Sequence, residues 1–318
     1  MPPLELRTTR LLVRFCTPEL LRAELAGNAA LGAALGARVA AEWPPGEHNL
    51  DAVRYFLETP GELRDGWANY YAITLPRPEA PATLVASIGY QGRPDGAGRV
   101  EIGYSVVASW RRRGIATEAL GAMLADAAQR GLRSMVAHAR PDNHASRAVL
   151  TKHRFRPSVS TREGQLGFER ALYRVRRTTA AELPDVNRAY ARISFEPSAP
   201  ADLQLAADRA GELVGLGRIA RLPVDTEDRS GVTLELGGVW VAPELRGGGV
   251  ARALVRALLA AAGGRPLACL PFAHLQRFYA SLGFVRWDAA QAPAALRRKL
   301  ARCAATHPEP VVLMVRRG

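Results

Sequence analysis

The sequence predicts an α+β protein made of two tandem copies of one fold, each a mixed, mostly antiparallel sheet flanked by helices. Three observations support this prediction. The chain of 318 residues has the length of two domains of about 150 residues, and 48% of its residues are apolar, which is enough for two cores. Strand-like segments precede a helix-like segment in each half. The segment VAPELRGGGVARAL (241–254) resembles VVASWRRRGIATEA (106–119) without a gap, at an offset of 135 residues.

In the first half, three segments rich in β-branched and aromatic residues predict strands at 67–75, 83–91 and 100–107, with proline- and glycine-rich turns between them. From Ile115 onward the apolar residues recur at helical spacing. We interpret 172–177 as the closing strand of this copy. The N-terminal domain is therefore expected to cover residues 1–177.

The second half repeats this order of elements. An opening helix is expected at 178–193, a hairpin at 202–222, a strand at 234–241, and a helix with apolar residues at helical spacing after it. The C-terminal domain is therefore expected to cover residues 178–318.

Composition and charge exclude several classes of protein. No stretch approaches about 20 uninterrupted apolar residues, and the N-terminus is charged where a signal peptide is apolar, so we expect a cytoplasmic protein with no membrane partner. The net charge of +13 favours polyanionic partners or a phosphorylated cofactor, but it is spread along the chain, which argues against nucleic acid. Cys16, Cys269 and Cys303 are isolated, so neither a disulfide framework nor a metal site is predicted.

Three consecutive glycines, Gly247 to Gly249, lie where the strand is expected to give way to the helix. A helix N-terminus presents unpaired N–H groups and a partial positive charge, and a glycine turn lets these groups converge on an anion such as a pyrophosphate. Neither copy has the lysine and hydroxyl residue of a Walker motif, and GLGRIA (215–220) lacks the helix that a dinucleotide motif requires. The shared pattern Arg-x-x-Gly-x-Ala therefore predicts an anion site in each half.

Both halves resemble the GNAT superfamily of acyl-CoA-dependent N-acetyltransferases over nearly the whole chain. The resemblance rests on EIGYSVVASWRRRGIATEAL followed by NHASRAVLTKHRF, and on LELGGVWVAPELRGGGVARAL followed by FYASLGF. It implies acetyl-CoA as co-substrate, with the pyrophosphate held at the turn and the pantetheine paired with the preceding strand. By this resemblance the coenzyme-binding residues are Val239, Val241, Arg246, Gly247, Gly248, Gly249, Val250 and Ala251 in the second half, and Val106, Arg111, Arg112, Arg113, Gly114, Ile115, Ala116 and Asn143 in the first.

Acetyl transfer to an amine needs a base for the ammonium, donors for an oxyanion and an acid for the departing thiolate. Glu235 lies eleven residues before Arg246, the spacing of the general base in histone-type members of the family. Tyr279 lies four residues before Gly283, the position of the proton-donating tyrosine in arylalkylamine-type members. The resemblance therefore predicts Glu235 and Tyr279 as catalytic residues, against the alternatives of an ordinary edge-strand carboxylate and a core aromatic residue.

The first half resembles the ribosomal-protein N-terminal acetyltransferase branch through Asn143 and Ser146. The resemblance implies that Asn143 binds the coenzyme and that Ser146 assists proton transfer. Arg154 replaces the glycine of the branch in KHRF, so we expect this turn to be built differently.

Two further departures separate the copies. Leu150 stands where the second copy has its tyrosine. Glu101 lies ten residues before Arg111 rather than eleven, so it should face the opposite side of its sheet from Glu235 unless a bulge restores the register. The first copy is thus either a second active site or a degenerate scaffold.

The sequence therefore predicts a metal-free N-acetyltransferase that transfers an acetyl group from acetyl-CoA to a primary amine by direct attack, with the chemistry in the C-terminal domain. The alternative is a non-catalytic acyl-CoA-binding or interaction protein with the same scaffold. The acceptor would be set by segments 31–60 and 290–310, which carry no motif for one amine. Amino acids, polyamines, antibiotics and protein N-termini are all compatible with them, and the sequence does not set the oligomeric state.

Overall fold

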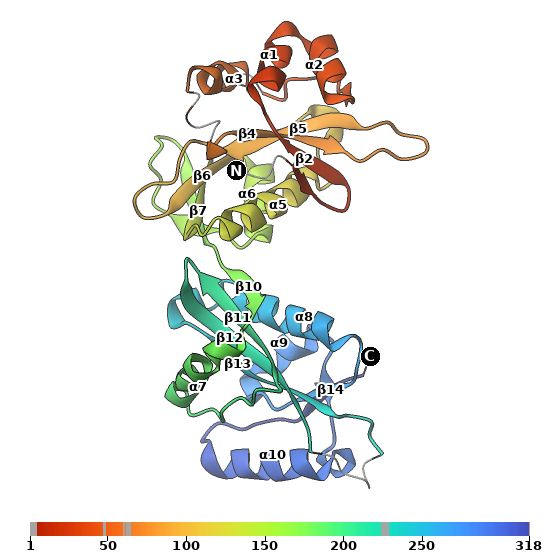
Figure 1. Ribbon diagram of the computed structural model, residues 1–318, viewed down its shortest axis with the longest axis vertical. Coiled ribbons are helices and arrows are strands. Elements are labelled where there is room, and N and C mark those ends of the chain that lie inside the picture. The colour runs from red at the N-terminus through yellow and green to blue at the C-terminus, as the bar shows by residue number, and fades with distance from the viewer. Residues whose placement is uncertain (1–4, 47–48, 60, 62–64, 224–228, 318) are drawn as a thin grey trace. The chain divides into compact units, whose positions relative to one another are not determined.

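The computed structural model describes residues 5–46, 49–59, 61, 65–223 and 229–317. The chain divides into two compact units, Met1–Leu172 and Tyr173–Gly318, each with its own sheet (Figure 1). None of the described helices combines the length and apolar character needed to cross a membrane.

The first unit is built on a sheet in the order β1-β2-β4-β5-β6-β7-β9-β8, with β3 paired to β5. Its strands are β1 (Glu5–Arg7), β2 (Leu11–Phe15), β3 (Arg38–Val39), β4 (Asn69–Thr74), β5 (Thr83–Tyr90), β6 (Arg99–Val106), β7 (Ser134–Ala139), β8 (Arg156–Ser158) and β9 (Leu166–Ala171). The pairs β6–β7 and β3–β5 are parallel, and the other described pairs are antiparallel.

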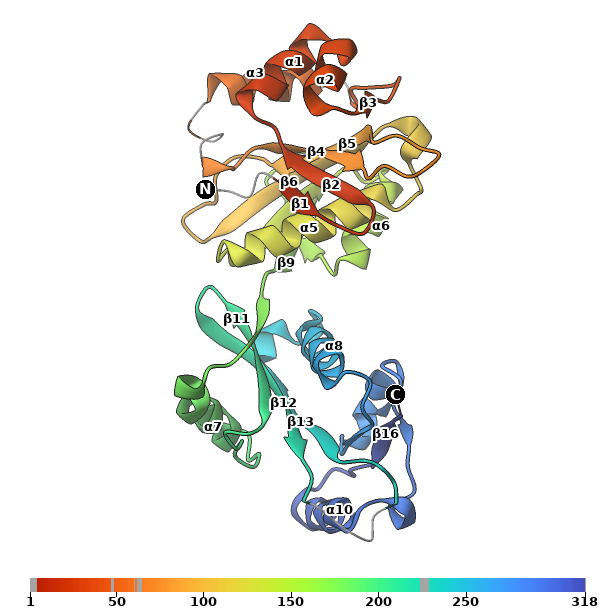
Figure 2. The same cartoon turned by 45° about the vertical axis from the view of Figure 1, so that its right-hand side comes forward.

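Helices cover both faces of this sheet. Helices α1, α2 and α3 lie over one face and α5 and α6 over the other (Figures 1 and 2). The helices are α1 (Pro18–Ala26), α2 (Asn28–Leu35), α3 (Asn49–Glu58), α5 (Ile115–Gln129) and α6 (His144–Lys152).

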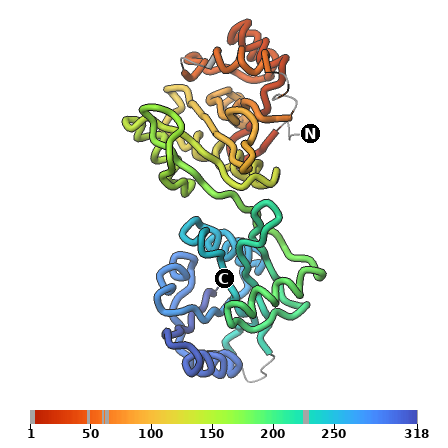
Figure 3. The backbone as a smooth tube through the Cα atoms, turned by 90° about the vertical axis from the view of Figure 1, so that its left-hand side faces the viewer, coloured from red at the N-terminus to blue at the C-terminus, as the bar shows by residue number. Residues whose placement is uncertain are grey.

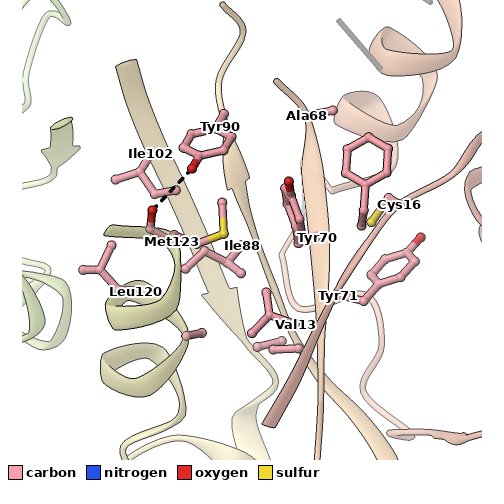
Figure 4. Packing of buried hydrophobic residues seen from close by; sticks show 14 of the residues in the cluster. Val13, Cys16, Ala68, Tyr70, Tyr71, Ile88, Tyr90, Ile102, Leu120 and Met123 are labelled. Atoms are coloured by element: carbon pink, nitrogen blue, oxygen red, sulfur yellow. Dashed lines mark hydrogen bonds between the residues drawn. The ribbon is translucent and has the colours of Figure 1, made fainter. Parts of the chain in front are cut away.

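The core of the first unit fixes α5 against β6. Leu120 and Met123 of α5 are fully buried and lie beside Ile102 of β6 (Figure 4). The buried hydroxyl of Tyr90 lies 2.6 Å from Asp126 Oδ2 and 3.3 Å from the carbonyl oxygen of Met123, so it satisfies polar groups of the same helix. These contacts hold α5 against β5 and β6.

The second unit is built on a sheet in the order β10-β11-β12-β13-β14-β16-β15. Strand β16 lies between β14 and β15. Figure 3 shows the last part of the chain, in dark blue, inside the second unit. The strands are β10 (Arg174–Arg177), β11 (Leu203–Arg209), β12 (Glu212–Arg221), β13 (Leu234–Val241), β14 (Leu267–Cys269), β15 (Val285–Arg286) and β16 (Met314–Arg316). The helices are α7 (Leu183–Arg192), α8 (Val250–Ala262), α9 (Gln276–Ala280) and α10 (Ala294–Thr306).

The glycines of GLGRIA have a packing role in this unit. A Cβ atom at Gly215 would lie 3.0 Å from Val250 Cγ1, and one at Gly217 would lie 3.0 Å from Leu258 Cδ1. Both contacts come from α8, so these glycines let the helix approach β12 closely.

The prediction that 172–177 closes the first copy is wrong. Strand β10 pairs antiparallel with β11 and belongs to the second sheet, whereas Leu172 still donates its N–H to Arg133 of the first. The alternation of residues predicts a strand but does not identify its neighbour, which is set by pairing at long range.

A one-residue bulge interrupts β13. Gly237 pairs with Arg218, and Trp240 pairs with Leu216. Between these two pairs β13 therefore has one residue more than β12. Gly238 has a left-handed backbone with φ of 61°, and a Cβ atom there would lie 2.6 Å from the Tyr190 hydroxyl. Only glycine fits this position without displacing the tyrosine.

We expect Gly238→Ala to lower the free energy of unfolding by at least about 2 kcal/mol, because it combines left-handed strain with overpacking. Gly263→Ala is the matched control, since Gly263 is also left-handed, with φ of 64°, but a Cβ atom there meets nothing within 4 Å. Urea denaturation compares the two variants, and equal losses would contradict the role of the Tyr190 contact.

Candidate functional site

In the second unit, β13 extends beyond the end of its parallel neighbour β14. Strand β13 pairs with β14 from Leu234 to Leu236, and beyond Leu236 it continues to Val241 without β14. Its other edge stays paired to β12 as far as Val241. The edge of 237–241 that faces the gap therefore has backbone groups that must find a partner in water or in a ligand.

The first unit leaves a similar edge on β6. Strand β6 pairs with β7 from Arg99 to Glu101 and then continues to Val106, while its other edge remains paired to β5. Each unit thus offers one short, protected strand edge of about five residues inside its sheet. Such an edge can accept an extended, amide-bearing ligand as a further strand.

Each free edge leads into an equivalent turn. Arg246 Nε donates to the carbonyl oxygen of Val241 at 3.3 Å, and Arg111 Nε donates to the carbonyl oxygen of Val106 at 3.0 Å. These two predicted phosphate-binding arginines therefore also close the turn between strand and helix.

The helices that follow start without a side-chain cap. Gly249 before α8 and Gly114 before α5 are left-handed N-cap residues, with φ of 97° and 78°, and neither helix has a side-chain hydrogen bond at its N-cap. The first N–H groups of α8 and α5 are therefore available to an anion. Val250 and Ile115 are buried, so these two residues can offer only their backbone to a ligand.

The second position of each turn is also left-handed. Gly247 has φ of 74°, and Arg112 occupies the same position in the first unit with φ of 61°. An arginine is costly in this conformation, by about 1–2 kcal/mol. Arg113 places its guanidinium 5.0 Å from the centre of the Trp110 ring.

Glu235 lies on the face of β13 opposite α8, and it is buried. Lys299 Nζ of α10 lies 2.7 Å from Glu235 Oε1 and 2.9 Å from Oε2, and it also contacts Glu196. Burial raises the pKa of Glu235 above its ordinary value, and Lys299 opposes that rise. Both carboxylate oxygens are therefore already partnered by Lys299, a cation 64 residues away that no sequence motif predicted.

Tyr279 projects from α9 into the core of the second unit. It is 6% exposed and packs edge-on against Phe278 and Phe284. Burial raises the pKa of Tyr279, with Cys269 adding to the rise, and no hydrogen-bond partner for its hydroxyl occurs within the described residues. Glu235 pairs with Ala268 of β14, the residue before Cys269. Glu235 raises the pKa of the Cys269 thiol, and Cys269 raises that of Tyr279, so both proposed catalytic side chains lie near the end of β14.

The expectation of a different turn at Arg154 is wrong. Phe155 donates its N–H to the carbonyl of Leu150, just as Phe284 donates to Tyr279. Arg154 has φ of 61° where Gly283 has 89°, so the arginine adopts the glycine-type conformation and the turn is conserved in shape. Leu150 itself is fully buried and has no proton to give.

Asn143 and Ser146 lie at the start of α6. Asn143 is the N-cap of the helix, and its Oδ1 accepts a hydrogen bond from Ser146 N at 3.0 Å. Ser146 Oγ lies 2.9 Å from the hydroxyl of Tyr104 on the free part of β6, a residue that the sequence analysis did not single out. Burial raises the pKa of Tyr104, and its contact with Ser146 opposes the rise.

The bulge at Gly238 explains why Glu101 and Glu235 lie on equivalent faces of their sheets despite their different spacing. It adds one residue to β13 that β6 lacks, which compensates for the spacing of ten rather than eleven. Glu101 alternates with Ile102, which faces α5, and Glu235 lies on the face of its sheet opposite α8. Glu101 and Glu235 therefore occupy equivalent faces.

No described group of three or more histidine, cysteine, aspartate or glutamate side chains could hold a metal ion. Cys16, Cys269 and Cys303 are free thiols. The site consists of backbone donors, arginines, a carboxylate and a tyrosine.

Comparison with known proteins identifies both units. Residues 19–156 match the family described as acetyltransferase (GNAT) domain, and residues 171–284 match the acetyltransferase (GNAT) family. Together these matches support N-acetyltransferase function with acetyl-CoA as the co-substrate. No curated protein matches the chain.

Solved structures similar to this chain include three bacterial proteins. A putative ribosomal-protein-serine acetyltransferase from Vibrio cholerae is 16% identical with a TM-score of 0.37, covering 54% of this chain and 99% of its own. RimJ from Mycobacterium smegmatis, in complex with CoA-disulfide, is 22% identical with a TM-score of 0.34, covering 51% and 81%. A putative GNAT-family acetyltransferase from Bordetella pertussis is 21% identical with a TM-score of 0.39, covering 52% of this chain and 99% of its own.

Because both units match models of the family, the chain belongs to the GNAT acetyltransferases and carries two domains of that family in tandem.

Proposed function

We propose that the protein is an acetyl-CoA-dependent N-acetyltransferase whose C-terminal domain transfers the acetyl group to a primary amine by direct attack. The strongest support is the separation of β13 from β14 after Leu236, directly before the left-handed turn at Gly247 to Gly249. In this proposal the pantetheine amides pair with the free edge of 237–241, and the pyrophosphate binds the first N–H groups of α8.

Tyr279 is proposed as the acid that protonates the departing thiolate. A phenol buried in an apolar environment keeps its proton at neutral pH, so it has one to donate when the carbon–sulfur bond breaks. The burial of Tyr279 and the absence of a competing acceptor among its described neighbours support this role. N–H groups on the free edge of β13 would stabilise the oxyanion.

Glu235 is proposed as the base, acting through water. Direct transfer from an ammonium with a pKa near 10 to an ordinary carboxylate is uphill by about 8 kcal/mol, so the proton must leave by a relay or the amine must arrive neutral. The contact with Lys299 favours the ionised form of Glu235, which keeps the carboxylate ready to accept a proton.

One observation favours the alternative, an acyl-CoA-binding protein without transfer activity. Both oxygens of Glu235 already contact Lys299, as in a structural ion pair. In that case Glu235 would hold α10 against the sheet, and turnover would not depend on either proposed catalytic residue.

The acceptor is proposed to be a small-molecule amine or a protein N-terminus. Lys299 of α10 contacts Glu235, so α10 lies on the same face of the sheet as Glu235. In this proposal α10 lines the acceptor site. The chain offers no charge pattern that selects between these two kinds of amine.

We expect Gly249→Asp to weaken coenzyme binding at the second domain at least about tenfold. The new carboxylate would occupy the N–H groups of α8 and repel the pyrophosphate. Gly263→Asp is the matched control, because it introduces the same residue into a left-handed glycine at the other end of the same helix. Calorimetric titration with acetyl-CoA measures both, and unchanged binding in Gly249→Asp would show that the turn is not the coenzyme site.

We expect Tyr279→Phe to lower kcat by roughly 10- to 10⁴-fold with little change in coenzyme affinity, since a general acid usually contributes about 10²- to 10⁴-fold. Tyr190→Phe is the control, since Tyr190 is also buried in this unit with no partner for its hydroxyl among the described residues. Release of free thiol from acetyl-CoA with a panel of amines measures turnover. Full activity of Tyr279→Phe would assign proton donation to another group.

We expect Glu235→Gln to remove or shift the acidic limb of the kcat/KM profile, with activity recovering at high pH where free amine is present. Burial raises the pKa of Glu235 above the ordinary 4.5, so the limb should lie above that pH, and activity should fall as the carboxylate is protonated.

Glu196→Gln is the control for Glu235→Gln, because it removes another carboxylate contact of Lys299 that does not lie on β13. The limb should persist in this control. An unchanged profile and rate in Glu235→Gln would eliminate Glu235 from the mechanism.

A further inference from the structure

The first domain contains a carboxylate, an imidazole and a hydroxyl connected in series. Glu101 Oε1 lies 3.1 Å from His138 Nδ1, and His138 Nε2 lies 3.3 Å from Thr161 Oγ1. Glu101 also pairs with Arg162 Nη2 at 2.8 Å. The three groups come from β6, from β7 and from the segment between β8 and β9, so the fold brings them together from distant parts of the chain.

We infer that the first domain holds an acetyl-transfer site of its own, in which Glu101, His138 and Thr161 accept the proton of the amine and Tyr104 supplies a proton to the thiolate. This inference extends the proposed function to a second site. It depends on the same coenzyme chemistry but on no residue of the C-terminal domain.

The position of the series relative to the strands supports this role. Glu101 and Val136 form the last pair between β6 and β7, and His138 follows two residues later on the same face of β7. The free edge of β6 starts at this point and ends near Gly114, where the pyrophosphate would bind. A coenzyme lying along the edge would therefore have its thioester end beside Glu101 and His138.

The two ring nitrogens of His138 have different hydrogen-bond partners. In the tautomer whose Nδ1–H donates to Glu101, Nε2 faces Thr161, with the Thr161 backbone nitrogen 3.4 Å and the Thr161 hydroxyl 3.3 Å from it. Thr161 is exposed, whereas the His138 side chain is only 6% exposed. An acceptor amine can therefore reach the hydroxyl of Thr161, and the hydroxyl can pass a proton to the buried imidazole.

The donor lies on the other side of β6. Tyr104 is three residues from Glu101, so its side chain leaves the opposite face of the strand. Its hydroxyl lies 2.9 Å from Ser146 Oγ and 3.3 Å from the Ser146 carbonyl oxygen. Base and acid thus stand on opposite sides of the gap between β6 and β7, and Tyr104 can replace the phenol that is absent at Leu150.

The reaction balances with these groups. The amine nitrogen attacks the thioester carbon, a carbon–nitrogen bond forms, and the carbon–sulfur bond breaks. The proton of the amine passes through Thr161 Oγ1 to His138 Nε2, and the thiolate of coenzyme A takes the proton of Tyr104. Bulk solvent then returns both groups to their starting protonation states.

The test uses the 318-residue chain with Gly249→Asp, at an acetyl-CoA concentration well below the dissociation constant that titration gives for the substituted second domain, so that this domain stays largely empty. Free-thiol release from acetyl-CoA is followed with a panel of amines and peptide N-termini, and with water alone. We expect turnover to remain in this background and to be lost when Gly114→Asp is added.

His138→Gln in the same background should lower kcat by about 10²- to 10⁴-fold with an unchanged KM for acetyl-CoA, because glutamine cannot take a proton. His144→Gln, the same substitution at an exposed histidine of this domain, should leave kcat unchanged. Thr161→Val should lower kcat and Thr161→Ser should restore it, which a purely structural contact of the segment would not require.

Each outcome separates this inference from the proposed function. If wild-type chain is active and Gly249→Asp is inert, the second site is overturned and the proposed function stands. If Gly249→Asp retains turnover that His138→Gln does not change, the proton-accepting series is overturned. If Gly249→Asp is as active as wild type and sensitive to His138→Gln, the site stands and the assignment of the chemistry to the C-terminal domain fails.

Discussion

The structure depends on a parallel strand pair that is kept short in each domain. Three residues of β13 pair with β14 and three residues of β6 pair with β7, after which one edge of each longer strand is left without a strand partner. Unpaired backbone groups inside a sheet cost free energy unless water or a ligand satisfies them. The adjoining features follow from this gap: the arginine that closes the turn, the left-handed glycine before the helix, and the uncapped helix start. Together they form a surface for a ligand that carries amides at one end and phosphates at the other.

The two copies preserve this backbone while differing in the side chains around it. Arg112 and Arg154 hold left-handed conformations that Gly247 and Gly283 adopt at the equivalent positions of the second copy. Retention of these conformations at some cost indicates that the shape of the turns matters in both domains. The proposed proton donors differ more: the second domain has a phenol on α9, whereas the first has Tyr104 on β6, which contacts Ser146 on α6. The two copies of the fold therefore carry different side chains beside the free strand edges of β6 and β13.

The features that the sequence predicted well are those with a local physical cause. Helical spacing located α5 and α8, and the glycines 247–249 predicted a turn at the start of α8. Three features required the fold. The pairing of β10 with the second sheet, the contact of Lys299 with Glu235 over 64 residues, and the meeting of His138 with Glu101 all join segments distant in sequence. The spacing of the two glutamates implies that Glu101 and Glu235 occupy equivalent faces of their sheets only if one strand has a bulge. The strand pairing shows that this bulge lies in β13.

We propose that the free edges of β13 and β6 bind coenzyme A as an additional strand. Hydrogen–deuterium exchange of the full-length chain with and without coenzyme A tests it directly, because an amide that gains a hydrogen bond exchanges more slowly. We predict slower exchange in 237–241 and 102–106 and in the first turns of α8 and α5, with little change in β11 or β4. Exchange that is unaltered in these two edges, despite binding of the coenzyme, would contradict the account.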